Sequence, residues 1–552
     1  MRYKKVLAII SIVTILTGGM VGCSKGESDE TGNNSSSVVN LDYNIEKKED
    51  KNQAIDVSDF NLGDGTIVDP TGRKVPYKIR GTMAAPKEAG KYPLVIIGHG
   101  SHSGFSKDRF DNGFQYLVEA IAKQGYVALS MDIQLQFSLD DGEPHWIERT
   151  DSIYREHIAK LKEANEGKDL GYNIDLKDKV DFDNQIFIGH SRSGQDMLLL
   201  ADRLQEEGND SVKGMISIAP SQVYYVSKVG DEEREPSPEY YADIPTGFII
   251  PEYDGDVVTL DGLTMYDKIL NEDTERKSWM SAVVLKGGKH NFFNTLLKED
   301  LTFLAQETVI VNKLNEEQHR DFLVNYTIDF LNAIFENNTD NTVFDLDSPT
   351  PNKMYGYNVI TKLDVPTINS VELVDIKNAD MVKGDKIQVE SKVEDWIPVN
   401  DKIGAFRDPR LADPIDLLSV TWNEKGSNAT IDVSNNKDFS KYESLSLQLT
   451  QNPTNEANKV DVNQGLTLIL KDSKGKESKV IVGPDNTVLE YIPGKVIGDS
   501  EYPYYSNYNI IGEVRVPISY FKGIDLANVA SLSLMFDETD SGNIVIEEIS
   551  LK

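Results

Sequence analysis

The feature that most constrains the fold of this chain is a sharp turn centred on Ser191. Residues 189–194 have the sequence Gly-His-Ser-Arg-Ser-Gly; they follow the apolar run 185–188 and open a helical pattern over 195–200. A strand, a tight turn carrying a serine and then a helix form the setting of a nucleophile elbow. There, small flanking residues let the backbone bend and lift the hydroxyl to the top of a sheet. We therefore expect Ser191 to be a nucleophile.

An acid and a base follow Ser191 in the order that this chemistry requires. Asp254 comes just after an apolar run, with Asp256 as the alternative acid, and His290 follows another apolar run and a pair of glycines. In acyl transfer the histidine takes the serine proton, and the acid orients the imidazole and stabilises its cation. The order serine, aspartate, histidine differs from the orders found in chymotrypsin and subtilisin.

A glycine-rich loop at 98–104 follows the apolar run 92–97 and is the candidate oxyanion loop. Such a loop can direct a backbone N–H at a developing oxyanion. We expect this role for the N–H of Ser101 and for that of Arg192, the residue after the nucleophile. Loops after strands also supply the candidates for substrate binding: His102, Phe105, Tyr224 and Phe292. His99 and His102 lack a matching set of further ligands, so neither a metal nor a cofactor is expected.

Strand-like and helical segments alternate from about residue 60 to 335. Strands are expected at 75–83, 126–132 and 212–219, and helices at 153–164 and 319–335. This alternation predicts a doubly wound, mostly parallel sheet. Residues 337–366 are rich in Asn, Asp, Thr and Pro and are expected to be a linker. Residues 367–552 show short alternating strands separated by turn residues, which predicts an all-β sandwich.

The N-terminal segment has the composition of a targeting signal. Three basic residues precede an apolar stretch over 6–21, and Cys23 follows. Residues 1–23 resemble the signal peptide of bacterial lipoproteins. That resemblance implies cleavage before Cys23, lipidation of its thiol and a place on the extracellular face of a bacterial cell membrane. The polar segment 24–58 is then a disordered tether.

Composition excludes several classes of protein. The formal net charge of −33 argues against nucleic-acid binding through a basic surface. Cys23 is the one cysteine of the sequence, which excludes an intramolecular disulfide and a cysteine-protease mechanism.

Residues 59–336 resemble the α/β-hydrolase superfamily, and within it the branch of secreted dienelactone hydrolases, cutinases and polyester hydrolases. The motifs that carry this resemblance lie at 189–192, 218–220, 253–257 and 289–294. The family usually has glycine where this chain has Ser193, and a serine there could crowd the turn. Residues 367–552 resemble a galactose-binding-like jelly-roll module, through the segments 438–445, 514–521 and 542–549.

Together these resemblances imply an α/β-hydrolase fold, with a mostly parallel doubly wound sheet, followed by an all-β jelly-roll sandwich domain. The implied function is that of a lipid-anchored serine hydrolase acting on an ester-bearing small molecule or polymer, with Ser191, Asp254 and His290 as the triad. A polysaccharide is the candidate ligand of the C-terminal module. The alternatives are a peptidase or amidase with the same triad, and a surface-binding protein whose hydrolase domain is inactive.

Overall fold

The structure is a computed structural model. It describes residues 38–48, 51–68, 74–102, 107–134, 146–222, 228–229, 232–233, 242–257, 260–298, 312–366, 369–394, 415–436, 438–452, 455–492, 496–497, 504–505 and 509–552. Cys23 and the rest of the signal segment lie outside these ranges. In the described part of the chain, no helix has the length and apolarity needed to cross a membrane.

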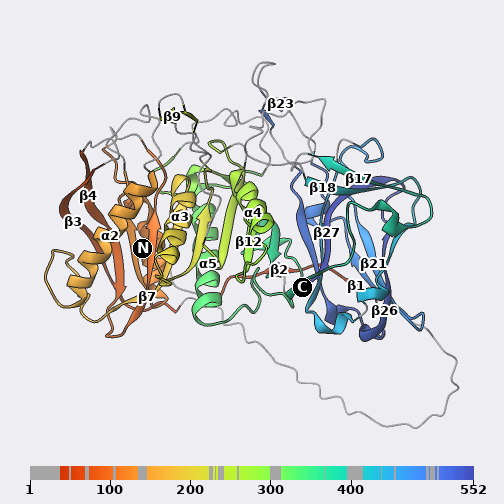
Figure 1. Ribbon diagram of the computed structural model, residues 1–552, viewed down its shortest axis with the longest axis horizontal. Coiled ribbons are helices and arrows are strands. Elements are labelled where there is room, and N and C mark those ends of the chain that lie inside the picture. The colour runs from red at the N-terminus through yellow and green to blue at the C-terminus, as the bar shows by residue number, and fades with distance from the viewer. Residues whose placement is uncertain are drawn as a thin grey trace, which may run out of the picture. The chain divides into compact units, whose positions relative to one another are not determined.

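The largest element is a mixed sheet of eleven strands (Figure 1). In spatial order the strands are β2 (Asn44–Ile45), β13 (Lys353–Met354), β14 (Tyr357–Asp364), β12 (Met280–Lys289), β11 (Thr246–Tyr253), β8 (Val212–Ile218), β7 (Val180–His190), β5 (Tyr92–Gly98), β6 (Val127–Met131), β4 (Lys74–Pro86) and β3 (Ile55–Val68). The strands from β12 to β6 run parallel. The strands β14, β4 and β3 pair antiparallel with their neighbours.

Both faces of the parallel part are apolar, because successive side chains of a strand point to opposite sides. On β5, Leu94 and Ile96 belong to one apolar core, whereas Val95 and Ile97 belong to another. The first core includes side chains of α2 (Trp146–Asn165), α3 (Arg192–Glu206) and α4 (Asp261–Glu272), and the second includes those of α1 (Gln115–Lys123) and α5 (Glu316–Phe335). Helices therefore cover both faces.

Two further sheets of six strands follow in the C-terminal part. One contains β1 (Val38–Asn40), β22 (Glu477–Val482), β21 (Leu466–Asp472), β26 (Val529–Phe536), β19 (Ser427–Asp432) and β16 (Val382–Lys383). The other contains β17 (Ile387–Glu394), β18 (Ile415–Trp422), β27 (Gly542–Leu551), β20 (Ser444–Gln451) and β25 (Gly512–Pro517), with β15 (Val371–Glu372) pairing to β27. Trp422 stacks on Phe536 with ring centroids 4.1 Å apart, so the two sheets pack face to face. Two short ribbons complete the strands: β9 (Lys228–Val229) with β10 (Glu232–Glu233), and β23 (Val496–Ile497) with β24 (Tyr504–Tyr505).

The predicted fold class, an α/β-hydrolase fold followed by a jelly-roll sandwich, is wrong. The residues that the structure describes are more strand than helix, 38% against 24%, and they contain only five α-helices among large mixed sheets. The prediction extended the strand–helix alternation around Ser191 to the flanking segments. There β3 and β4 form a long antiparallel hairpin with no helix between them, and β14 pairs antiparallel with β12 although α5 lies between these two strands in the sequence.

Strands also occur in the two segments that were expected to be irregular. Within 24–58, β1 pairs parallel with β22 and β2 pairs parallel with β13, and β3 begins at Ile55. Within 337–366, β13 and β14 join the large sheet. These segments therefore connect the large sheet to the C-terminal sheets through backbone hydrogen bonds.

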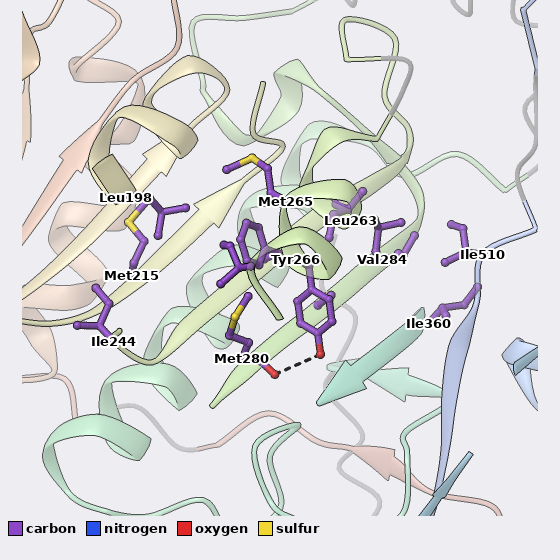
Figure 2. Close-up of a cluster of buried hydrophobic side chains, with 14 of the residues drawn as sticks. Leu198, Met215, Ile244, Leu263, Met265, Tyr266, Met280, Val284, Ile360 and Ile510 are labelled. Atoms are coloured by element: carbon purple, nitrogen blue, oxygen red, sulfur yellow. Dashed lines mark hydrogen bonds between the residues drawn. The ribbon is translucent and has the colours of Figure 1, made fainter. Parts of the chain in front are cut away.

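The large sheet and the C-terminal sheets share one apolar core and a set of buried ion pairs. Figure 2 shows the core around α4, where Ile360 of β14 lies beside Ile510 of the C-terminal part. Next to it, the Lys362 ammonium contacts Asp267 of α4 and Glu547 of β27, each at 3.0 Å. Lys362 thus joins three elements that lie far apart in the sequence.

A second buried cation, Lys552, lies at the same contact between the large sheet and the C-terminal sheets. The Lys552 Nζ atom donates to the Leu363 carbonyl at 2.7 Å, and it lies 2.7 Å from Asp364 and 3.3 Å from Glu513. Asp364 and Glu513 are both buried, so their charges depend on cations that are buried with them.

Candidate active site

Ser191 occupies a strained turn between β7 and α3. Its φ and ψ angles are 57° and −121°, a conformation that non-glycine residues rarely adopt. The turn is closed by backbone hydrogen bonds from Ser191 to the Ile218 carbonyl (2.9 Å) and from Gly194 to the Ser191 carbonyl (2.8 Å). Such strain persists only where the surroundings enforce it, and it holds Ser191 at the carboxyl end of the parallel strands.

Close backbone packing explains the glycines around the turn. A Cβ atom at Gly189 would lie 2.1 Å from the Ser193 carbonyl oxygen, so no side chain fits there. Gly100, on the loop after β5, approaches the nucleophile directly. A Cβ atom there would lie 3.0 Å from the Ser191 Cβ and 3.6 Å from its Oγ. The candidate oxyanion loop therefore passes against Ser191.

Asp254 and His290 form a buried pair at the ends of the neighbouring strands β11 and β12. The His290 Nδ1 atom lies 2.8 Å from an Asp254 carboxylate oxygen, and the two side chains are 1% and 2% exposed. The other carboxylate oxygen of Asp254 accepts the N–H groups of Asp256 (3.0 Å) and Val257 (2.6 Å). Because a carboxylate can only accept here, Nδ1 carries the proton, and Nε2 is the ring nitrogen on the opposite side.

Asp256 takes a different position from Asp254. Its carboxylate lies 3.4 Å from the His290 Nε2 atom, and its side chain is 61% exposed. Asp254 holds the ring through Nδ1, whereas Asp256 lies next to the opposite nitrogen. Asp256 adds a solvated negative charge beside Nε2.

His190 ties the serine turn to the histidine loop. Its Nε2–H donates to the His290 carbonyl at 2.9 Å, and the two rings have centroids 5.0 Å apart. Burial and the neighbouring His290 lower the pKa of His190 to about 3, so the ring is neutral. Since Ser191 directly follows His190, this bond places Ser191 and His290 at the same end of the sheet.

The two expected oxyanion donors belong to segments that contact Ser191. Arg192 directly follows Ser191 and is the first residue of α3, so its amide belongs to the positive end of the helix dipole. Ser101 lies on the loop after β5, is partly exposed, and directly follows Gly100, where the loop approaches Ser191.

The expected pocket residues separate into three cases. His102 stacks on Phe110 with ring centroids 3.6 Å apart, and burial lowers its pKa to about 2, so it is a neutral ring on the candidate oxyanion loop. Phe292 packs instead against His319, at 5.3 Å between centroids. Phe105 and Tyr224 lie outside the described residues.

Sequence reasoning missed the role of Ser193. Its side chain is fully buried, and its hydroxyl donates to the His99 carbonyl at 2.6 Å. The sequence shows a serine at position 193, where the family that this segment resembles usually has glycine. The sequence alone does not show which group this serine contacts. Nor does the sequence show that His99 folds back onto its own loop, with Nδ1 2.8 Å from the Gly100 carbonyl.

In the described ranges, no group of three or more histidine, cysteine, aspartate or glutamate side chains is arranged to hold a metal ion. No protein-family model matches the sequence, and no curated protein is similar to it at a significant level.

Proposed function

We propose that this protein is a serine hydrolase that cleaves carboxylic esters through an acyl-enzyme. The observation that carries the proposal is the strained Ser191 turn beside the buried Asp254–His290 pair. Nucleophile, base and orienting acid come from the ends of three strands of one sheet, β7, β12 and β11, which is where parallel sheets build their sites.

Each group has a defined part in the reaction. The Ser191 Oγ attacks the ester carbonyl carbon while its proton passes to the His290 Nε2, and the backbone amides of Ser101 and Arg192 stabilise the oxyanion. The bond to the leaving alcohol then breaks, and the alcohol takes the proton from His290. Water attacks the acyl-enzyme in the same way, releases the carboxylic acid and returns the proton to Ser191. Asp254 stabilises the His290 cation throughout.

The location and the substrate complete the proposal. From the sequence of residues 1–23 we infer a protein that is lipid-anchored at Cys23 on the outer face of a bacterial membrane. A substrate that reaches it there is an ester-bearing small molecule or polymer.

The test is hydrolysis of a series of p-nitrophenyl esters by residues 24–552, together with labelling by a fluorophosphonate probe. Ser191→Ala and His290→Ala should abolish both signals. The matched pair Asp254→Asn and Asp256→Asn separates the two candidate acids. The first should lower kcat by about 10³- to 10⁴-fold, as loss of the triad acid does, and the second should leave most activity intact. Absence of labelling in the parent protein would overturn the proposal.

A further inference from the structure

The Ser193 hydroxyl links the turn at residues 189–194 to the loop after β5. Ser193 is the second residue of α3, it is fully buried, and its Oγ–H donates to the His99 carbonyl at 2.6 Å. Gly98 leaves the space for it, because a Cβ atom at Gly98 would lie 3.0 Å from both Cβ and Oγ of Ser193. The bond therefore joins the helix that follows the nucleophile to the loop that flanks it.

The next carbonyl of the same loop is also held. The His99 Nδ1 atom lies 2.8 Å from the Gly100 carbonyl, and its Nε2 accepts the Ile133 N–H at 3.0 Å. A carbonyl can only accept and a backbone N–H can only donate, so in these two bonds the ring proton of His99 is on Nδ1; Nε2 also lies 3.4 Å from the Asp132 carboxylate. Two successive carbonyls, of His99 and Gly100, are thus fixed by hydrogen bonds.

Fixing these carbonyls also fixes two amides. In a trans peptide the N–H points opposite to the C=O of the same unit, so the Gly100 N–H turns away from the Ser193 hydroxyl. In the same way the Ser101 N–H turns away from the His99 ring. These amides lie on the stretch of loop that passes Ser191, where the position of a Cβ atom on Gly100 is 3.0 Å from the Ser191 Cβ.

We propose that Ser193 is a positioning residue for the oxyanion loop: its hydroxyl sets the orientation of the Gly100 amide relative to Ser191, and so supports the adjoining Ser101 amide, whose peptide the His99 ring holds. This inference rests on the proposed hydrolase function. Oxyanion donors must lie within hydrogen-bond distance of the oxygen as it becomes charged. A small rotation of their peptide planes therefore reduces the stabilisation of the transition state more than the stabilisation of the bound substrate. A serine where glycine is usual is then a gain for catalysis, since it supplies a contact that glycine cannot make.

The experiment compares Ser193→Ala with Ser217→Ala in the full-length protein. Ser217 is the matched control, because it is equally buried and its hydroxyl also donates to a backbone carbonyl of the turn, that of Gly194 at 3.1 Å, without touching the loop after β5. The measurements are kcat and KM for the best p-nitrophenyl ester, and the inhibition constant of a trifluoromethyl ketone of the same chain length, which mimics the tetrahedral oxyanion. Urea unfolding of each variant is measured alongside.

Ser193→Ala should lower kcat by about 10- to 100-fold with KM changed less than about twofold. It should raise the inhibition constant of the ketone by the same factor by which kcat falls. Ser217→Ala should destabilise the fold to a similar degree and leave kcat within about threefold of the parent. If Ser193→Ala does not fold, Ser193→Gly replaces it, with the same expectation.

Two results would overturn the inference. One is a decrease in kcat for Ser193→Ala that is no larger than the decrease for Ser217→Ala. The other is an increase in KM with the inhibition constant of the ketone unchanged. Either result leaves the proposed function standing as long as Ser191 still reacts with the fluorophosphonate. If the parent protein itself is not labelled, the proposed function fails, and the role of Ser193 fails with it.

Discussion

Replacing Asp256 with asparagine should shift the acid limb of the pH–activity profile to lower pH. His290 acts as a base only when its Nε2 is unprotonated, and the Asp256 carboxylate 3.4 Å away favours the protonated ring. Of the other groups that face the ring, Asp254 is unchanged by the substitution and His190 is neutral at the pH values of interest. Removing the charge of Asp256 therefore makes the base available at a lower pH.

The separation of the two groups sets the size of the shift. Coulomb's law with the dielectric constant of water gives about 1.2 kcal/mol for unit charges 3.4 Å apart. The value for water is the weak limit of the interaction, because the Asp256 side chain is 61% exposed but that of His290 only 1%. Since one pH unit corresponds to about 1.4 kcal/mol, and salt screens part of the interaction, the expected shift is at least about 0.5 units.

The assay is the second-order rate of fluorophosphonate labelling between pH 4.5 and 9, at low and at high salt. The control is Asp183→Asn, which removes the same charge from a side chain that is 89% exposed and lies at the start of β7, away from His290. The shift should appear with Asp256→Asn alone and should shrink at high salt. No shift, a shift to higher pH, or an equal shift in the control would refute the reasoning.

Three further predictions concern the turn at Ser191, the buried ion pairs between the large sheet and the C-terminal sheets, and the buried carboxyl group of Asp196. Gly100→Ala should slow fluorophosphonate labelling by at least about 100-fold, because the new methyl group would lie 3.0 Å from the Ser191 Cβ; a rate equal to that of the parent would contradict this. Lys552→Met should destabilise the protein by about 3–5 kcal/mol in urea unfolding, because it removes a buried cation from Asp364 and from Glu513, which keeps only its pair with Arg515; a loss below about 1 kcal/mol would exclude that role. Burial raises the pKa of Asp196 from 3.8 to about 6, so the folded protein holds this proton after the unfolded chain has released it. Stability should therefore fall by about 3 kcal/mol relative to Asp196→Asn as the pH rises through that window, measured as the difference in unfolding free energy at several pH values.

The parts of the fold that could be predicted are those with strong local patterns. The apolar runs at 92–97 and 212–219 coincide with β5 and β8, and the helical spacing at 319–335 lies within α5. Ser191 lies at the junction of β7 and α3, where the turn sequence placed it. Each of these elements is buried along a whole face, so its sequence carries its own periodicity.

The parts that failed depend on distant partners. The strand β3 carries Asp56, Asp59 and Asp64 on a hairpin that needs β4 beside it, so its sequence resembles a polar tether. The strand β14 buries Lys362 and Asp364, and both are tolerated only because charges more than 80 residues away compensate them. No local pattern reports such pairings, and the predicted fold class failed for this reason.

Similar limits applied to the site. The order of Ser191, Asp254 and His290 could be recognised because each follows an apolar strand. Which carboxylate meets Nδ1, by contrast, depends on the path of two residues after β11. The bond from Ser193 to the His99 carbonyl joins residues that are 94 positions apart, so it could be found only in three dimensions.

The strands β1 and β2 have a consequence for the solubility of shortened forms of the protein. β1 is the outermost strand beside β22, and β2 is the outermost strand beside β13. A shortened protein that began at Asp59, where the sequence suggests a catalytic domain to start, would lose both strands. Two rows of backbone N–H and C=O groups would then be uncovered, and bare strand edges recruit other chains into aggregates. Val38 is therefore the latest start that keeps both edges covered.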